Sequence, residues 1–237
     1  NDVTVLARGE RLQQLKKYGI IIEDKIFNEN FKTGIKTVDK LRPDDYYDLV
    51  LIIMQCQQVT KILPVLQKNR KVPSFIFIGN NVNGAEEYLK YLERKRILLG
   101  FGGPGGYRKN HSVIAAYVKD YCILYFGELS GKVSERVERI KNIFQKSEIK
   151  VNIPEDIDAW LKSHAALISP LAAAAYAVRD KGKSMGDEDK ILSVSIRAIK
   201  ENLRALKELG IPILPKKFKL MRLIPVYFLK RRLKNVN

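Results

Sequence analysis

Two uninterrupted apolar runs limit the folds open to this chain. The stronger run, Tyr47–Met54, follows the polar segment Pro43–Asp45, and the second run covers Ser74–Ile78. Strands that are apolar on both faces are typical of parallel sheets, which are covered on both sides. A helix is predicted between the runs, over Gln58–Gln67, and another after the second run, over Ala85–Leu92. This alternation of strand and helix predicts an α/β fold.

The pattern changes along the chain. Strands are also predicted over residues 2–7 and 97–101, and residues 113–118 and 122–126 are interpreted as an antiparallel pair. From Pro154 onward the periodicity is helical. Three helices are predicted there, over residues 154–179, 187–209 and 217–234. We therefore expect an α/β domain over residues 1–151 and an all-helical domain over residues 152–237.

The composition favours phosphate-bearing partners without choosing among them. The formal net charge is +17, and residues 216–237 hold eight basic side chains and no acidic one. Nucleic acid, an anionic membrane surface and a phosphorylated cofactor all fit such a charge. No apolar run reaches the roughly 18 residues of a membrane span. Two cysteines, Cys56 and Cys122, are too few for a disulfide framework, which favours a reducing compartment such as the cytoplasm.

Polar residues follow the predicted strands at the edge where parallel sheets bind ligands. Arg8 follows the first strand, where a guanidinium could bind the 2′-phosphate of NADP; an ordinary solvated arginine is the alternative. Asn80, Asn81 and Asn83 follow the strand at Ser74–Ile78. They are interpreted either as turn residues or as amide donors to a ligand.

Lys162 lies on a helix whose apolar residues form one stripe. It falls off that stripe, beside small residues, so it could be a partly desolvated proton donor or an ordinary exposed lysine. His164 falls on the stripe and is interpreted as a packed core residue. With His111 as the only other histidine, no metal site is expected.

Several motifs, taken in order, resemble one family. They are Leu6-Ala7-Arg8-Gly9 after the first strand, Gln55-Cys56-Gln57-Gln58-Val59, Gly79-Asn80-Asn81-Val82-Asn83-Gly84, a glycine-rich loop at Gly102–Gly106, and Ala159-Trp160-Leu161-Lys162. Their order and spacing resemble the ketopantoate reductase (2-dehydropantoate 2-reductase) family. The resemblance covers most of the chain and is strongest over residues 2–179.

The resemblance implies a Rossmann-like dinucleotide-binding domain followed by a helical domain. It also implies NADPH-dependent reduction of a 2-oxo acid, either 2-dehydropantoate or a related substrate. In the family's pattern Lys162 matches the general acid, Asn81 matches a residue that contacts cofactor and substrate, and Arg8 matches the group that meets the 2′-phosphate.

Other family positions carry different residues here. At cofactor-binding positions, Gln55 replaces a frequent lysine and Gly106 lies in the glycine-rich loop, while Val82 replaces the glycine that follows the asparagine in the family's turn. At the substrate-binding position one turn after the lysine, Ala166 replaces an asparagine. The family's opening strand with its Gly-x-Gly-x-x-Gly turn would precede Asn1, so we expect a divergent member seen without both of its ends.

The expected partners are a small 2-oxo acid and a possible second copy bound through the helical domain, with no nucleic acid and no membrane. Two alternatives remain open. The chain could be an NADP-binding homologue without catalytic activity, or its basic segment could bind nucleic acid or a membrane surface.

Overall fold

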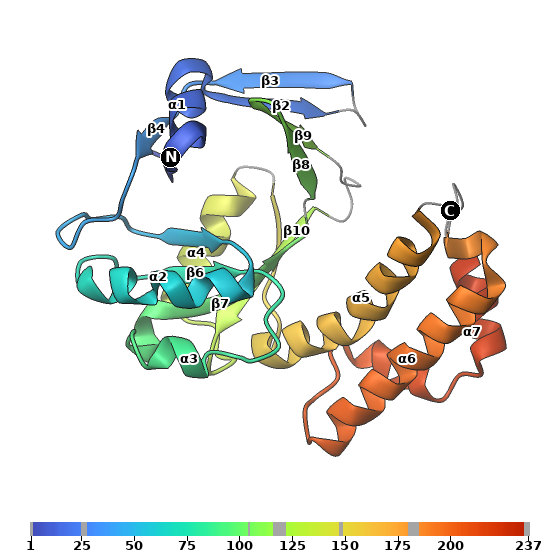
Figure 1. The fold of residues 1–237 in the computed structure, drawn as a ribbon. Helices are drawn as coiled ribbons and strands as arrows, with labels where there is room; N and C mark the ends of the chain where they lie inside the picture. Colours follow the sequence, from blue (N-terminus) through green and yellow to red (C-terminus); the bar gives the residue numbers. More distant parts are fainter. Residues whose placement is uncertain are drawn as a thin grey trace. The chain divides into compact units, whose positions relative to one another are not determined.

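The computed structural model describes residues 2–24, 28–103, 105–115, 122–146, 149–179 and 185–234. The chain divides into two compact units (Figure 1). One is an α/β unit of residues 1–79 and 85–155, and the other is a helical unit of residues 80–84 and 156–237. The predicted fold class, α/β followed by helices, is confirmed.

The largest sheet of the α/β unit has the strand order β11–β10–β7–β6–β5. Strands β5, β6 and β7 are parallel, while β10 runs antiparallel to β7 and β11 parallel to β10. The connections between the parallel strands contain two helices, as the strand–helix alternation predicts. The bounds are β5 Val50–Ile53, α2 Cys56–Lys68, β6 Phe75–Ile78, α3 Glu86–Leu89, β7 Ile97–Gly102, β10 Ile123–Glu128 and β11 Lys150–Asn152.

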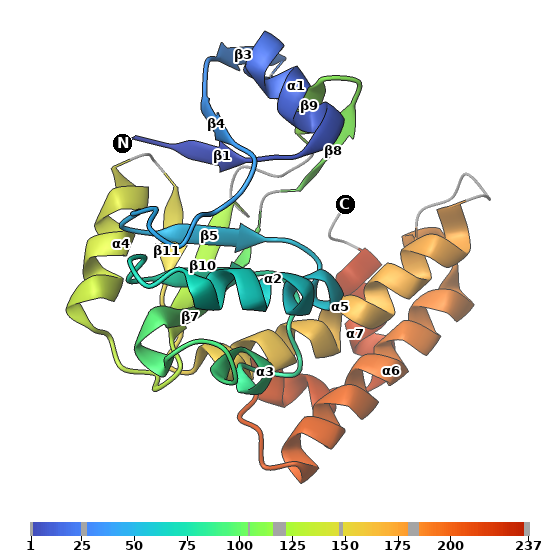
Figure 2. The same ribbon diagram turned by 60° about the vertical axis from the view of Figure 1, so that its left-hand side comes forward.

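One core cluster of this unit lies between the sheet and helix α4, Glu135–Gln145 (Figure 2). Side chains from β6, β7 and β10 meet apolar side chains from α4. Their burial removes apolar surface from water, which is the main favourable term in folding. The buried members are Ile76, Ile78, Leu98, Leu124, Phe126, Val137 and Ile140.

Strand β5 departs from the expectation of burial on both faces. Ile52 is buried, but Leu51 and Ile53 are 39% and 71% exposed. Within the described residues β5 pairs with β6 alone and forms the edge of the sheet. An edge strand lacks a neighbour on one side, so its apolar residues need not be covered.

Two smaller sheets complete the unit. One pairs β1 (Thr4–Leu6) with β4 (Lys36–Val38) in parallel, and the helix α1 (Gly9–Tyr18) follows β1. The other has the order β3–β2–β9–β8, with bounds β2 Ile20–Asp24, β3 Glu29–Thr33, β8 Gly106–Lys109 and β9 Ser112–Ala115.

The predicted antiparallel pairing of residues 113–118 with 122–126 is wrong. Strand β9 pairs with β2 and β8, whereas β10 pairs with β7 and β11 in another sheet. Residues 116–121 lie outside the described ranges. Nearness in the sequence favoured the pairing, but each strand finds both neighbours elsewhere.

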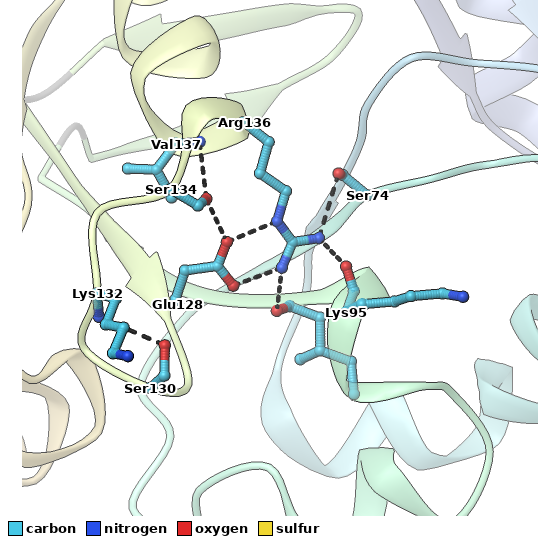
Figure 3. Close-up of polar contacts among 9 residues, drawn as sticks. Ser74, Lys95, Glu128, Ser130, Lys132, Ser134, Arg136 and Val137 are labelled. Carbon is cyan, nitrogen blue, oxygen red and sulfur yellow. Dashed lines mark hydrogen bonds and ion pairs between the residues drawn. The ribbon is translucent and has the colours of Figure 1, made fainter.

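An ion pair joins the start of α4 to the sheet (Figure 3). Both oxygens of Glu128 accept hydrogen bonds from Arg136, at 2.7 Å from Nε and 2.5 Å from Nη2. Arg136 also donates to Ser74 Oγ and to the carbonyls of Lys95 and Ile97. The side chain of Ser134 donates to Glu128 Oε1 and accepts from the backbone N–H of Val137, so it caps the helix.

The helical unit is built around α5 (Ile157–Arg179) and α6 (Asp189–Glu208). Ala166 of α5 packs with residues of α6 and the following loop, namely Ile199, Leu203 and Ile213. A second cluster joins α6 to α7 (Val226–Lys234) and contains Leu192, Ile196 and Leu229. Among the described residues, no helix is long and apolar enough to cross a membrane.

The single helix predicted over residues 217–234 is wrong in its continuity. A 3-10 helix covers Lys216–Arg222, and α7 begins only at Val226. Pro225 separates the two because proline lacks a backbone N–H and disfavours helical geometry in the residue before it. Leu220, Leu223 and Phe228 are exposed, whereas Leu229 is buried against α6.

Candidate functional site

Lys162 lies in the second turn of α5 and forms an ion pair there. Its Nζ is 2.5 Å from Oδ2 of Asp158, one helical turn earlier, and the two side chains are 21% and 37% exposed. The spacing of four residues places both side chains on the same helix face. The lysine is thus a partly shielded ammonium with a defined position.

The turn at residues 80–84 belongs to the same unit as α5. Asn81 is buried, and its side-chain amide holds the turn together. Its Nδ2 donates to the carbonyl of Gly84 at 2.7 Å, and its Oδ1 accepts from the backbone N–H of Asn83 at 3.0 Å. These bonds agree with the interpretation of Asn81 as a turn residue, and the neighbouring Val82 is exposed.

Gly84 brings this turn against the ion pair. Its φ of +70° is a left-handed backbone conformation that favours glycine. A Cβ at this position would lie 3.0 Å from Oδ1 of Asp158 and 3.9 Å from Nζ of Lys162. The structure therefore brings the Asn81 turn and Lys162 together, with Asp158 as a third member that the sequence reasoning missed.

His164 lies one turn further along α5 than Trp160. The two rings stack with centroids 5.2 Å apart, and burial lowers the pKa of the imidazole. This position agrees with the interpretation of His164 as a packed residue. Within the described ranges, no group of three or more His, Cys, Asp and Glu side chains could hold a metal ion.

Ala166, expected at the substrate position, is buried against α6. Its methyl group packs with apolar side chains, so it has no surface to offer a ligand. Its carbonyl accepts a hydrogen bond from Nδ2 of Asn202 at 3.1 Å. The sequence reasoning also missed Asn202, because its proximity to Ala166 depends on the packing of α6 against α5.

The remaining candidates lie in the α/β unit. Arg8 is exposed at the N-cap position of α1 and makes no side-chain capping bond. Gly9, which follows it, has a φ of +56°, and a Cβ there would meet nothing within 4 Å. An open helix N-terminus beside a guanidinium is a donor set that fits a phosphate group.

Gln55 and Gly106 are held by local contacts. Gln55 is exposed at the N-cap of α2, and its Oε1 accepts from Nε2 of Gln57 at 2.8 Å. Gly106 begins β8, where a Cβ would lie 2.5 Å from the carbonyl oxygen of Ile114. The close approach of β8 to β9 therefore explains this glycine without a ligand.

Known proteins resemble this chain in sequence and in fold. The family model of ketopantoate reductase PanE/ApbA matches residues 1–131. A 2-dehydropantoate 2-reductase from Pyrococcus horikoshii is 21% identical over 214 residues, which are 89% of this chain and 67% of that protein. The chain thus spans about two thirds of the length of this relative.

Solved structures share the architecture at low sequence identity. The 2-dehydropantoate 2-reductase from Geobacter metallireducens superposes with a TM-score of 0.75 and 13% identity, covering 98% of this chain and 75% of that one. A D-mandelate dehydrogenase solved with NADH superposes with a TM-score of 0.71 and 13% identity. The match covers 94% of this chain and 70% of that one. These likenesses confirm the Rossmann-like fold with a helical second part. With its family model matched over more than half its length, the chain belongs to the ketopantoate reductase family of oxidoreductases, as a divergent member.

Proposed function

We propose that the protein reduces a 2-oxo acid with NADPH, with Lys162 as the general acid. The observation that carries the proposal is the shielded ammonium of Lys162, held beside the Asn81–Gly84 turn. Membership of an oxidoreductase family supports the reaction class. The substrate we propose is 2-dehydropantoate or a close relative, and the product is the corresponding 2-hydroxy acid.

The roles of the chain's own residues follow from their chemistry. A bound nicotinamide dinucleotide supplies the hydride for the keto carbon. Lys162 gives a proton from Nζ to the keto oxygen, so that the carbonyl becomes a hydroxyl group. Asn81 fixes the turn that faces the lysine, and we propose that this turn contacts both cofactor and substrate.

We propose NADP rather than NAD because of Arg8. The 2′-phosphate distinguishes the two cofactors, and arginine offers a planar fork of donors that matches its oxygens. The exposed guanidinium and the open N-terminus of α1 support this preference. In this proposal residues 1–151 bind the cofactor, and residues 152–237 bind substrate and can pair with a second copy in the cytoplasm.

Replacing the proposed acid tests the reaction. Lys162→Ala should lower turnover about a hundredfold or more, while the affinity for NADPH stays within a factor of about two. Steady-state reduction of 2-dehydropantoate by the full-length protein, followed by NADPH absorbance, measures this. Lys141→Ala, which removes a lysine paired with Glu138 on α4, is the matched control and should leave turnover unchanged. Normal turnover of Lys162→Ala would refute the assignment.

The cofactor preference has its own test. NADPH at a hundredfold excess over its dissociation constant should stabilise the full-length protein by about 2.7 kcal/mol, and NADH at that concentration by much less. Arg8→Ala should reduce the difference between the two cofactors. Equal stabilisation by NADH would contradict the role of Arg8.

A second candidate is an NADP-binding protein without catalytic activity. The observation behind it is Ala166, whose methyl group is buried in the helix packing where the family carries an asparagine. In that case NADPH would stabilise the protein, yet neither the wild type nor Lys162→Ala would reduce any 2-oxo acid.

A further inference from the structure

The partner of the candidate acid differs from an ordinary surface charge. Asp158 Oδ2 contacts Lys162 Nζ at 2.5 Å, which accounts for one oxygen of the carboxylate. The other oxygen, Oδ1, is shielded from solvent and accepts no hydrogen bond from any described residue. A buried acceptor without a hydrogen bond destabilises the fold, so this arrangement calls for an explanation.

The Asn81–Gly84 turn lies against this oxygen. A Cβ on Gly84 would lie 3.0 Å from Oδ1, so only a residue without a side chain fits there without a shift. The side-chain amide of Asn81 fixes the shape of this turn through two hydrogen bonds. Asp158 is therefore confined between its own helix and a turn whose shape is set independently.

Other lysines paired with acids along a helix lack this arrangement. Lys141 and Glu138 on α4 are 3.2 Å apart, and Glu138 is exposed. Lys90, which pairs with Glu87 at 2.5 Å, is 67% exposed, against 21% for Lys162. Exposed pairs contribute little to stability and leave both side chains free to change rotamer.

We propose that Asp158 is a positioning residue for Lys162. Its Oδ2 takes one N–H of the ammonium and holds the flexible lysine stem against the turn, which leaves the other two N–H groups to meet the substrate oxygen. This inference rests on the proposed function, because it assigns the residue that orients the general acid. Proper orientation matters because a misplacement of about 1 Å can cost about a hundredfold in rate.

Turnover measurements on the full-length protein test the proposal. Asp158→Asn keeps the shape and removes the charge, and it should lower kcat about tenfold or more with KM and NADPH affinity within about twofold. Asp158→Glu, which keeps the charge, should recover part of the loss. Glu138→Gln on α4 is the matched control and should leave kcat unchanged. Adding Asp158→Asn to Lys162→Ala should cause no further loss, because the aspartate acts through the lysine.

A labelling experiment gives a readout that does not depend on turnover. Brief acetylation with a water-soluble acylating reagent, followed by peptide mass spectrometry, reports how freely each lysine amine reacts. Asp158→Asn should raise the labelling of Lys162 severalfold, while Glu138→Gln should change that of Lys141 by less than about twofold. Thermal unfolding of each variant checks that it folds.

The outcomes separate the two proposals. If Lys162→Ala abolishes turnover but Asp158→Asn keeps kcat within about twofold of the wild type, the positioning role is refuted and the general acid stands. Unchanged labelling of Lys162 in Asp158→Asn also refutes it. If Lys162→Ala retains turnover, the proposed function fails, and the positioning role fails with it. Loss of turnover in both variants with raised labelling supports both proposals.

Discussion

Two ion pairs, one in each unit of the protein, have similar lengths and different surroundings. Glu128 and Arg136 in the α/β unit are 2.5 Å apart, as are Asp158 and Lys162 in the helical unit. Around Arg136, all three guanidinium nitrogens have partners, and both oxygens of Glu128 accept hydrogen bonds. At Asp158, one oxygen is buried and accepts no bond from the described residues.

The difference distinguishes an ion pair that stabilises the fold from one that can serve a ligand. The three guanidinium nitrogens of Arg136 and both oxygens of Glu128 are bonded within the protein, so this pair offers no donor to a substrate. The pair at Lys162 is incomplete, and its ammonium retains donors beyond the one that Asp158 takes. The short distance is the same in both ion pairs, so it does not tell a stabilising pair from a ligand-binding one. The hydrogen-bond partners of each polar atom do distinguish them.

The largest effect on stability should come from Arg136. Arg136→Ala leaves the partly buried Glu128 carboxylate without its main partner, which should lower the free energy of unfolding by about 2–3 kcal/mol. Urea unfolding followed by circular dichroism measures this. The exposed pair of Lys141 and Glu138 on α4 supplies the control. Lys141→Ala should lower the free energy of unfolding by less than about 1 kcal/mol. If Arg136→Ala lowered the free energy of unfolding by less than about 1 kcal/mol, the pair of Glu128 and Arg136 would not be the stabilising pair described above.

A smaller effect should appear at two glycines of the helical unit. Gly84 and Gly210 have φ values of +70° and +71°, but only at Gly84 would a Cβ meet the Asp158 carboxylate. Both Gly84→Ala and Gly210→Ala should lose about 1–2 kcal/mol for the backbone conformation. Gly84→Ala should in addition lower turnover severalfold, because it displaces Asp158.

Gly210→Ala is thus the control for backbone strain in that experiment. Thermal unfolding and steady-state kinetics on the two variants provide the comparison. Equal turnover in both variants would mean that the contact between Gly84 and the ion pair has no part in the reaction.

The smallest effect should be a dependence of stability on pH. Burial by itself would raise the pKa of Glu128, but hydrogen bonds and charge from Arg136, together with the bond from Ser134, outweigh it and hold this pKa below its usual 4.5. The stabilisation by this carboxylate is thus fully present above its unfolded-state pKa. It is lost as the pH falls through the lower pKa of the folded state.

Glu128→Gln removes this titration, so the variant should lose less stability than the wild type between about pH 6 and pH 3. Urea unfolding at a series of pH values measures the difference. Parallel curves for the two proteins would show that Glu128 does not contribute to the acid sensitivity.

The sequence predicted the parts of the fold that depend on local pattern. The two apolar runs, Tyr47–Met54 and Ser74–Ile78, contain β5 and β6, and α2 lies between them. It did not predict that β9 and β10 join different sheets, because strand pairing depends on neighbours far away in the sequence. Nor did it predict the exposure of Ile53, which follows from the edge position of β5.

At the candidate site, the resemblance to a family supplied Lys162 and Asn81. The geometry then added Asp158, which lies four residues before the lysine, a spacing that could have indicated the pair. The role of Gly84 could not be read from the sequence, because it depends on a turn that folds against a helix from a distant part of the chain.

The open edge of β5 leaves room for the sheet to grow by one strand. Leu51 and Ile53 lie beside a row of backbone donors and acceptors that has no partner strand among the described residues. Such an edge is a template on which a further strand can add. One further strand that pairs with β5 would satisfy these backbone groups and extend the parallel part of the sheet.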